Sequence, residues 1–298
     1  MRHQFSPPNR PFAHGRCWMI LRAAGIALLS TFLSAPIAAF IGPTAQASAV
    51  FDQHCAALDR RLAWQHRTPE TFIALSAEES SRLRRGEFVI EALTPKDADA
   101  SGAMLHHWRG SAFVPGAHAK DFERLLRDVG SYPRIYAPQV VTARALATST
   151  LDSGAHHSHI ALRLRQQKVL TVVLDTEYEI DHLRPSATLG YAVSRSTRVA
   201  EVASPSTASE HALTDHDAHG FLWRLRSDWS YAEADGGLYL QLETVSLTRD
   251  VPHGLGWLIG PFVQSIPRES LEFTLRASCN ALRAAQADAK ANRERNPR

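Results

Sequence analysis

The second half of the chain alternates between apolar and polar positions, which is the pattern of half-buried β-strands. Within residues 169–180, Val172, Leu174 and Ile180 share one face, and acidic residues occupy the other. Because successive side chains of a strand point to opposite faces of a sheet, this segment predicts a strand. Similar segments predict seven strands in all, at residues 104–114, 140–147, 159–164, 169–180, 189–202, 221–231 and 238–247.

Apolar residues at helical spacing predict helices before, within and after the strand region. Residues 50–85 form an N-terminal helical segment, and 117–129 form a helix after the first strand, with a short second piece at 135–138. Pro267 stands where the first turn of a helix tolerates proline. The helix that follows is expected to run about 20 residues, or roughly 30 Å. Its apolar stripe is Leu271, Leu275, Ser278 and Leu282.

The order of these elements is one strand, two short helical pieces, six strands and one long helix. It lacks the regular strand–helix alternation of a parallel α/β fold. We therefore predict an α+β fold in which sequential strands pair antiparallel. Seven long strands twist and curl. The C-terminal helix is the element placed to cover the concave side, with an internal cavity between helix and sheet.

The first 49 residues have the pattern of a secretory signal peptide. Arginines at the start precede an uncharged apolar stretch at residues 23–41, and Ala47-Ser48-Ala49 is an A-x-A cleavage site. Cleavage after Ala49 would place the protein in the periplasm or outside the cell. A retained membrane anchor is the alternative, because the apolar run is nearly long enough to span a bilayer. Pro36 and Pro43 favour cleavage.

The positive charge of the chain belongs to its leader. The whole chain has a net charge of +3. The leader carries four arginines and no acidic residue, so 29 basic and 30 acidic residues remain after it. No basic surface is left to indicate a nucleic-acid partner. Of the cysteines, Cys55 and Cys279 remain; export permits a disulfide that ties the two ends together, and two buried thiols are the alternative.

Two stretches carry a resemblance to a known superfamily. One runs from Trp108 through Gly116 into a helix at 117–128, followed by Tyr132-Pro133 and Pro138. The other is the Gly-Trp run at 254–262, followed by residues 265–270. Over residues 102–287 the chain resembles the START-like, or SRPBCC, superfamily, and most closely a subgroup of secreted bacterial proteins of unknown role. The resemblance implies the helix-grip fold: a curved seven-stranded antiparallel sheet, two short helices after the first strand and a long C-terminal helix.

The same resemblance implies an interior pocket for an apolar molecule, and it implies no reaction, because the superfamily shares no catalytic set. Outside residues 102–287, we expect a signal peptide at 1–49, a helical segment with a linker at 50–101 and a disordered tail at 288–298.

Aromatic side chains on these elements are the candidate ligand contacts. Strand aromatics are also the usual filling of a core, and both roles apply where a cavity exists. The Gly-rich run at 254–262 forms either a packed crossing that orients the last helix or a gate over the cavity mouth. The candidates are Trp108, Tyr136, Tyr178, Tyr191, Trp223, Trp257 and Phe262.

Patterns for catalysis or metal binding are weak. The histidines at 156–159 and the run 215–219 contain metal-ligand residue types, but no Cys pair or H-E-x-x-H framework accompanies them. We therefore expect no metal and no cofactor. The acidic face of residues 175–181 indicates a solvated face, or alternatively a cavity acid or base. No G-x-S-x-G elbow is present.

The sequence thus predicts an exported protein that reversibly binds an apolar small molecule or lipid, with at most transient membrane contact. The alternative is a cyclase- or hydrolase-like enzyme that uses a carboxylate or histidine in the same cavity. A third interpretation is an envelope interaction module whose cavity is filled by side chains. The sequence identifies no catalytic residue, no specific ligand and no oligomeric state.

Overall fold

The computed structural model describes residues 42–95, 102–151, 155–167, 171–214, 217–250 and 256–295, with side chains in the last segment described from Ser265 onward. Residues 1–41 of the predicted leader lie outside the described residues. None of the helices within the described ranges is long and apolar enough to cross a membrane.

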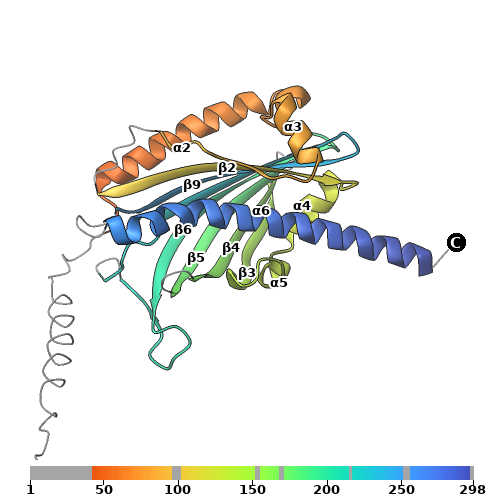
Figure 1. The fold of residues 1–298 in the computed structure, drawn as a ribbon. Helices are drawn as coiled ribbons and strands as arrows, with labels where there is room; N and C mark the ends of the chain where they lie inside the picture. The colour runs from red at the N-terminus through yellow and green to blue at the C-terminus, as the bar shows by residue number, and fades with distance from the viewer. Residues whose placement is uncertain are drawn as a thin grey trace, which may run out of the picture. The chain divides into compact units, whose positions relative to one another are not determined.

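The strands form one antiparallel sheet in the order β1-β2-β9-β8-β6-β5-β4-β3, and β7 pairs with β6 beside it (Figure 1). The alternation of the sequence correctly located the seven long strands. The described residues add two short ones, so the predicted strand number is too low. The long strands are β2 (Ala103–Pro115), β3 (Val140–Thr150), β4 (His156–Gln167), β5 (Thr171–Leu183), β6 (Leu189–Ala203), β8 (Arg224–Ala234) and β9 (Gly237–Arg249); the short ones are β1 (Val89–Ala92) and β7 (His211–Ala212).

Helices cover both faces of the sheet. In Figure 1, α6 crosses one face together with α4 and α5, and α2 with α3 lies on the opposite side. The two short helices follow the first long strand, as expected. The α-helices are α2 (Ala45–Gln65), α3 (Ala77–Arg84), α4 (Ala119–Arg127), α5 (Tyr132–Ile135) and α6 (Gly256–Arg295), and two 3-10 turns are η2 (Pro69–Thr71) and η3 (Val129–Ser131).

The apolar stripe of α6 packs directly on the sheet, which confirms the predicted contact between the C-terminal helix and the sheet. Leu271, Leu275 and Leu282 are each at most 2% exposed. The approach is close because β2 has a glycine below the helix: a Cβ on Gly110 would lie 2.5 Å from Leu271 Cδ2. A glycine at this position therefore lets α6 lie against the strand.

The limits predicted for α6 need correction at both ends. The helix begins at Gly256, so Gly260, Pro261 and Pro267 lie inside it. Glycine and proline lower helix propensity, but propensity is a weak prior that the surrounding structure overrides. The helix also continues to Arg295, through most of the tail expected to be disordered. This extension is rich in alanine and carries the i,i+4 pair Lys290–Glu294, both favourable to a helix.

The N-terminal helix begins inside the predicted leader. Thr44 caps α2 through a hydrogen bond from the Ala47 N–H to its Oγ1, and Ala47 is fully buried. Cleavage after Ala49 would remove the first turn of α2 and leave the rest of the helix. The cleavage site stays a prediction.

Cys55 and Cys279 are free, so of the two arrangements that the sequence left open, the disulfide is not the one present. Cys55 lies on α2 against the apolar cluster of the outer face, whereas Cys279 lies on α6 in the main core. Because the sheet separates them, the thiols act as small apolar residues, which was the alternative.

Candidate functional site

The main apolar core fills the space between the sheet, α4, α5 and the middle of α6. Phe122 of α4 packs edge-on against Trp229 and Tyr231 of β8, with ring centroids 5.0 and 5.2 Å apart. Tyr136 donates to or accepts from Ser278 Oγ of α6 at 3.0 Å. Burial raises the pKa of Tyr136 to about 12, so its hydroxyl stays protonated. This part of the interior is packed with side chains.

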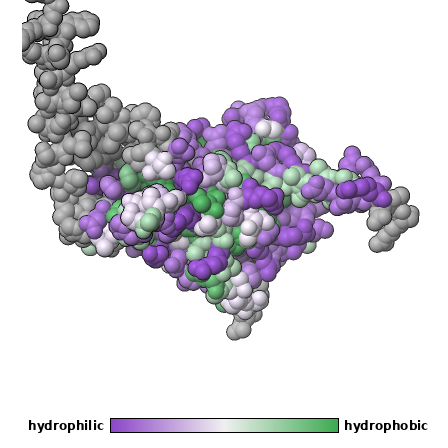
Figure 2. Space-filling model, turned by 90° about the horizontal axis from the view of Figure 1, so that it is seen from below, coloured by the Kyte–Doolittle hydropathy of each residue, from purple (hydrophilic) through white to green (hydrophobic). Residues whose placement is uncertain are grey.

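A second part of the same face is less covered. The side chains of Trp108, Leu162, Leu225, Phe273 and Ala277 pack against the core but remain partly exposed. Figure 2 shows apolar residues gathered in the middle of the face that it displays, with polar residues around them. Apolar surface is therefore accessible beside the core of this domain.

A row of small hydroxyl side chains crosses the sheet at this place. Trp108 of β2 pairs in register with Thr244 of β9, Thr244 with Ser227 of β8, and Ser227 with Ser194 of β6. These residues share the face of Leu242 and Trp229, which lie in the core beneath α6. Thr244, Ser227 and Ser194 are each partly exposed. Their hydroxyls make no hydrogen bond within the part of the chain that the structure describes.

We call this row, from Trp108 to Ser194, the hydroxyl row. Directly opposed residues of an antiparallel pair have Cβ atoms about 4.5–5.5 Å apart. The row is therefore a line of closely spaced donors and acceptors with an indole at one end. Small side chains here cover less of the sheet than larger ones would. The sequence analysis missed these three residues because serine and threonine at alternate strand positions look like an ordinary polar face.

The predicted ligand contacts do not all lie on one face. Trp108, Tyr178 and Tyr136 lie on the α6 side, the last two inside the packed core. Tyr191 lies on the opposite face, where its ring stacks on His66 of α2 with centroids 4.5 Å apart. Trp223 packs with the α2 cluster on that opposite face. Trp257 and Phe262 belong to α6, and their side chains lie outside the described ones.

The acidic residues of β5 lie on the outer face, which agrees with the solvated interpretation. Arg163 donates to both oxygens of Asp175, at 2.7 and 2.9 Å. His159 contacts Glu177 at 3.1 Å, and His157 contacts Asp181 at 2.8 Å. Across the described ranges, no three His, Cys, Asp or Glu side chains gather in the manner of a metal site; residues 215 and 216 lie outside those ranges.

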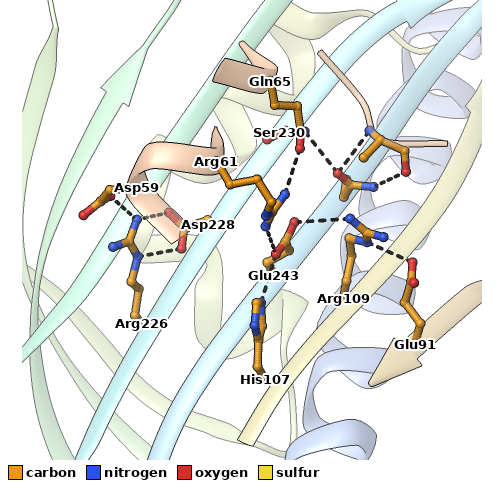
Figure 3. Close-up of polar contacts among 12 residues, drawn as sticks. Asp59, Arg61, Gln65, Glu91, His107, Arg109, Arg226, Asp228, Ser230 and Glu243 are labelled. Carbon is orange, nitrogen blue, oxygen red and sulfur yellow. Dashed lines mark hydrogen bonds and ion pairs between the residues drawn. The ribbon is translucent and has the colours of Figure 1, made fainter. Parts of the chain in front are cut away.

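The outer face carries a buried polar network under α2, drawn in Figure 3. Glu243 of β9 is 2% exposed and pairs with Arg61 of α2 and with His107 Nε2, the latter at 2.9 Å. His107 Nδ1 contacts His54 of α2 at 2.9 Å. Burial alone would raise the pKa of Glu243, but contacts with His107 and Arg61 outweigh it and lower the pKa.

A second ion pair lies beside this network. Arg226 of β8 donates to both oxygens of Asp228 at 2.8 Å and to Asp59 of α2 at 2.6 Å. Burial raises the pKa of the Asp228 carboxyl, and the two hydrogen bonds from Arg226 oppose that shift. Both residues lie in the strand predicted at residues 221–231, but the sequence did not predict a helix over them.

His182 is a buried histidine at the α4 end of the inner face. It is 5% exposed, and both ring nitrogens lack a hydrogen-bond partner in the described structure. Burial, with smaller effects from His156 and Arg127, lowers its pKa to about 4. The ring is therefore uncharged near neutral pH.

This burial predicts a pH effect on stability. The unfolded chain binds a proton near pH 6.5 and the folded chain only near pH 4, so stability falls as the pH drops through this window. The loss from His182 between pH 7 and 4.5 is about 2 kcal/mol. His182→Leu should flatten this part of a pH series of urea denaturations, and His211→Leu, at an exposed site, should keep the wild-type slope. Parallel curves for the wild type and His182→Leu would contradict the assignment.

The arrangement of the elements identifies the architecture. A curved antiparallel sheet has two short helices after its first long strand, and a long C-terminal helix lies across the concave face. The fold is α+β and matches the predicted helix-grip architecture. Relative to the expected helix-grip domain, it adds α2 and α3 over the outer face.

Comparison with known proteins adds likenesses of fold. No family model and no curated protein matches the chain. A STAR-related lipid transfer protein from Xanthomonas axonopodis is 17% identical, with a TM-score of 0.40 over 65% of this chain and 98% of that chain. The Zhui aromatase/cyclase from Streptomyces sp. R1128 is 16% identical, with a TM-score of 0.37 over 65% and 98%. Human STARD10 is 11% identical, with a TM-score of 0.39 over 76% and 90%. At these identities and TM-scores, lipid transfer and aromatase/cyclase activity are statements about those proteins and not about this chain.

Proposed function

We propose that this START-like domain binds an apolar small molecule or lipid reversibly, in the space between the sheet and α6. The observation that carries the proposal is the hydroxyl row beside partly exposed apolar side chains. Binding sites for small molecules combine apolar walls with a few polar groups that orient the ligand. Here Trp108, Leu225 and Phe273 supply apolar surface, and the hydroxyls of Thr244, Ser227 and Ser194 supply the polar groups.

The chemistry of the row indicates the kind of ligand. Hydroxyls donate and accept, so they can bind an oxygen or hydroxyl of a ligand without a charge. Apolar burial contributes roughly 25 cal/mol per Å² of surface removed from water, so the affinity comes mainly from the apolar body. The ligand of this proposal is therefore uncharged where it meets the sheet, with one or two oxygen groups.

Among the residues that the structure describes, the three buried carboxylates already have partners, which does not favour the enzyme alternative. Glu243 and Asp228 are paired with arginines on the opposite face. Glu201 accepts backbone hydrogen bonds from residues 219–221. These carboxylates hold the structure together.

Export is part of the proposal and has its own measurement. The basic start, apolar stretch and A-x-A site support removal of the leader. The ligand would then be carried in the periplasm or outside the cell, with transient membrane contact. N-terminal sequencing of the exported protein should find a start near residue 50. A start at Met1 or Arg2 would contradict this part.

A neutral fluorophore tests the proposed binding site beside the hydroxyl row, which we call the proposed groove. N-phenyl-1-naphthylamine should bind the purified protein with increased fluorescence, and organic extraction should release an apolar molecule. Ser227→Leu places a larger side chain in the middle of the hydroxyl row. It should lower the affinity for the fluorophore by about tenfold or more. Thr142→Leu, at an exposed position of β3, is the matched control.

Thermal melting would verify that both variants fold. Unchanged fluorophore affinity in folded Ser227→Leu would place the binding elsewhere and reject the proposed groove. No fluorophore binding by the wild type and no extractable molecule would reject the function.

A further inference from the structure

The outer face of the sheet holds a separate cavity of about 520 Å³. It lies between the C-terminal half of α2 and strands β5, β6 and β8. A volume of this size is within the range of small-molecule sites, about 300–1,000 Å³. A smaller cavity of about 220 Å³ along α2 shares Asp59, Arg195 and Arg226 with it.

One wall of this cavity is flat and uncharged. The rings of Tyr191 and Phe72 each stack on the His66 ring, with centroids 4.5 Å apart. Burial, with a smaller effect of Arg61, lowers the pKa of His66 to about 4, so the imidazole is neutral near pH 7. Its Nε2 is engaged with Ser230 Oγ at 2.8 Å. With Leu62 and Val193, this wall suits a planar apolar group.

The carboxylates of the cavity are already engaged at short distances. Asp228 accepts two hydrogen bonds from Arg226 at 2.8 Å, and Asp59 accepts one at 2.6 Å. Asp181 contacts His157 Nδ1 at 2.8 Å. Each of these three carboxylates therefore already has a guanidinium or imidazole partner at short distance.

Two arginines of the cavity, in contrast, have donors to spare. Arg195 lies 3.6 Å from Asp59 and 3.5 Å from Asp181, too far for well-formed hydrogen bonds. Arg67 lines the cavity and is exposed, and within the described residues no acidic group lies within ion-pair distance of its side chain. The unused hydrogen-bonding capacity of the cavity is thus mainly that of guanidinium donors, whose fork matches a carboxylate.

We propose that this outer cavity is a second binding site, for a small organic anion with a planar apolar body, such as an arylcarboxylate. Arg67 and Arg195 bind the carboxylate, and the ring lies along the Tyr191–His66 wall. The site goes beyond the proposed function, because it lies on the opposite face of the sheet from the hydroxyl row and takes a charged ligand.

Three naphthalene probes of similar shape test the charge preference by isothermal titration calorimetry. 2-Naphthoate should bind one molecule per chain, neutral 2-naphthalenemethanol about tenfold more weakly, and cationic 2-naphthylmethylamine no better than the alcohol. Arg67→Ala and Arg195→Ala should each lower the affinity for 2-naphthoate by about tenfold. Arg60→Ala removes the same charge from an exposed position of α2 outside the cavity and should leave the affinity unchanged.

The outcomes separate this site from the groove under α6. Both arginine variants should retain wild-type affinity for N-phenyl-1-naphthylamine. If 2-naphthoate competes with that fluorophore and responds to Ser227→Leu rather than to the arginine variants, it occupies the groove and the second site is rejected. Absence of 2-naphthoate binding, or equal binding of the amine, also rejects it. Because Arg67 is exposed, Arg67→Ala decides the test even if Arg195→Ala fails to fold.

Discussion

Replacing Asp228 with alanine is expected to lower the free energy of unfolding by about 3–5 kcal/mol, because it leaves the Arg226 guanidinium buried without its main partner. Both side chains are nearly inaccessible, Arg226 at 3% and Asp228 at 2%. Urea denaturation at pH 7 measures the change. The large effect follows from the cost of an unpaired buried charge, since the net contribution of the intact pair is small.

Two variants test this explanation. Asp59 binds the same guanidinium but is 52% exposed, so Asp59→Ala should cost only about 1 kcal/mol or less. The double variant Arg226→Met with Asp228→Leu removes both charges and should recover most of the stability. An Asp228→Ala variant within about 0.5 kcal/mol of the wild type would show that solvent reaches the pair. The Arg226–Asp228 pair would then contribute little to holding α2 on the sheet.

The inner half of the fold could be predicted from the sequence because its signals are local. Each long strand carries its own alternation, and α6 carries the stripe Leu271, Leu275 and Leu282, so neither depends on a distant residue to be recognised. The Asp235-Gly236 turn between β8 and β9 is equally local: both residues have positive φ, as a tight hairpin turn requires.

The outer half could not be predicted because its polar residues are satisfied only by a distant helix. Gln241 and Glu243 alternate with leucines in β9, which is also what a solvated strand face looks like. In the structure they meet Gln65 and Arg61 of α2, more than 170 residues earlier in the chain. The polar stripe of α2 at Arg61 and Gln65 was the available signal, but only the apolar stripe was used.

The same reason explains the partial success with the ligand-contact aromatics. A strand with both faces covered buries aromatic residues on either side, so Tyr178 and Tyr191 look alike in the sequence. The register then separates them, Tyr178 to the main core and Tyr191 to the α2 side. The residues of the hydroxyl row carried no aromatic signal at all. Only the pairing of β2, β9, β8 and β6 brings them together.

The outer cavity keeps its α2 residues after leader removal. Cleavage after Ala49 would leave α2 from residue 50 onward, including Asp59, Leu62 and His66 of the outer cavity. It would remove the buried Ala47 and the Thr44 cap. Loss of a helix cap costs about 1 kcal/mol, and the α2 residues that line the outer cavity remain in the chain. The outer cavity is therefore compatible with export.

The second large effect concerns the contact between Gly190 of β6 and Tyr231 of β8, which are register partners. A Cβ on Gly190 would lie 2.3 Å from Tyr231 ring atoms. The Tyr231 residue is 1% exposed, and its ring packs edge-on against Phe122. It therefore has no free space into which to move. An aromatic side chain covering a glycine of the neighbouring strand is a known device for stabilising a sheet.

Tyr231→Ala should lower the free energy of unfolding by about 3–5 kcal/mol, because it opens a cavity in the core. Gly190→Ala should cost about 3 kcal/mol, because the added methyl overlaps the ring. Once the ring is absent, the same methyl fits into the space that it leaves. The double variant should therefore be more stable than the sum of the single changes predicts, by about 1–3 kcal/mol.

Urea denaturation of the wild type, the two single variants and the double variant measures this coupling. Gly130→Ala is the control. A Cβ on Gly130 would have its nearest neighbour, Asp128 Oδ1, 3.8 Å away, so an added methyl there meets ordinary contacts. Additive losses for Gly190→Ala and Tyr231→Ala would mean that the ring and the glycine do not share one space. Strong coupling would show that the contact of Tyr231 with Gly190 fixes β8 against β6. These two strands carry part of the hydroxyl row on the α6 face and part of the outer cavity on the α2 face. Both proposed sites would then rest on the same rigid pair of strands.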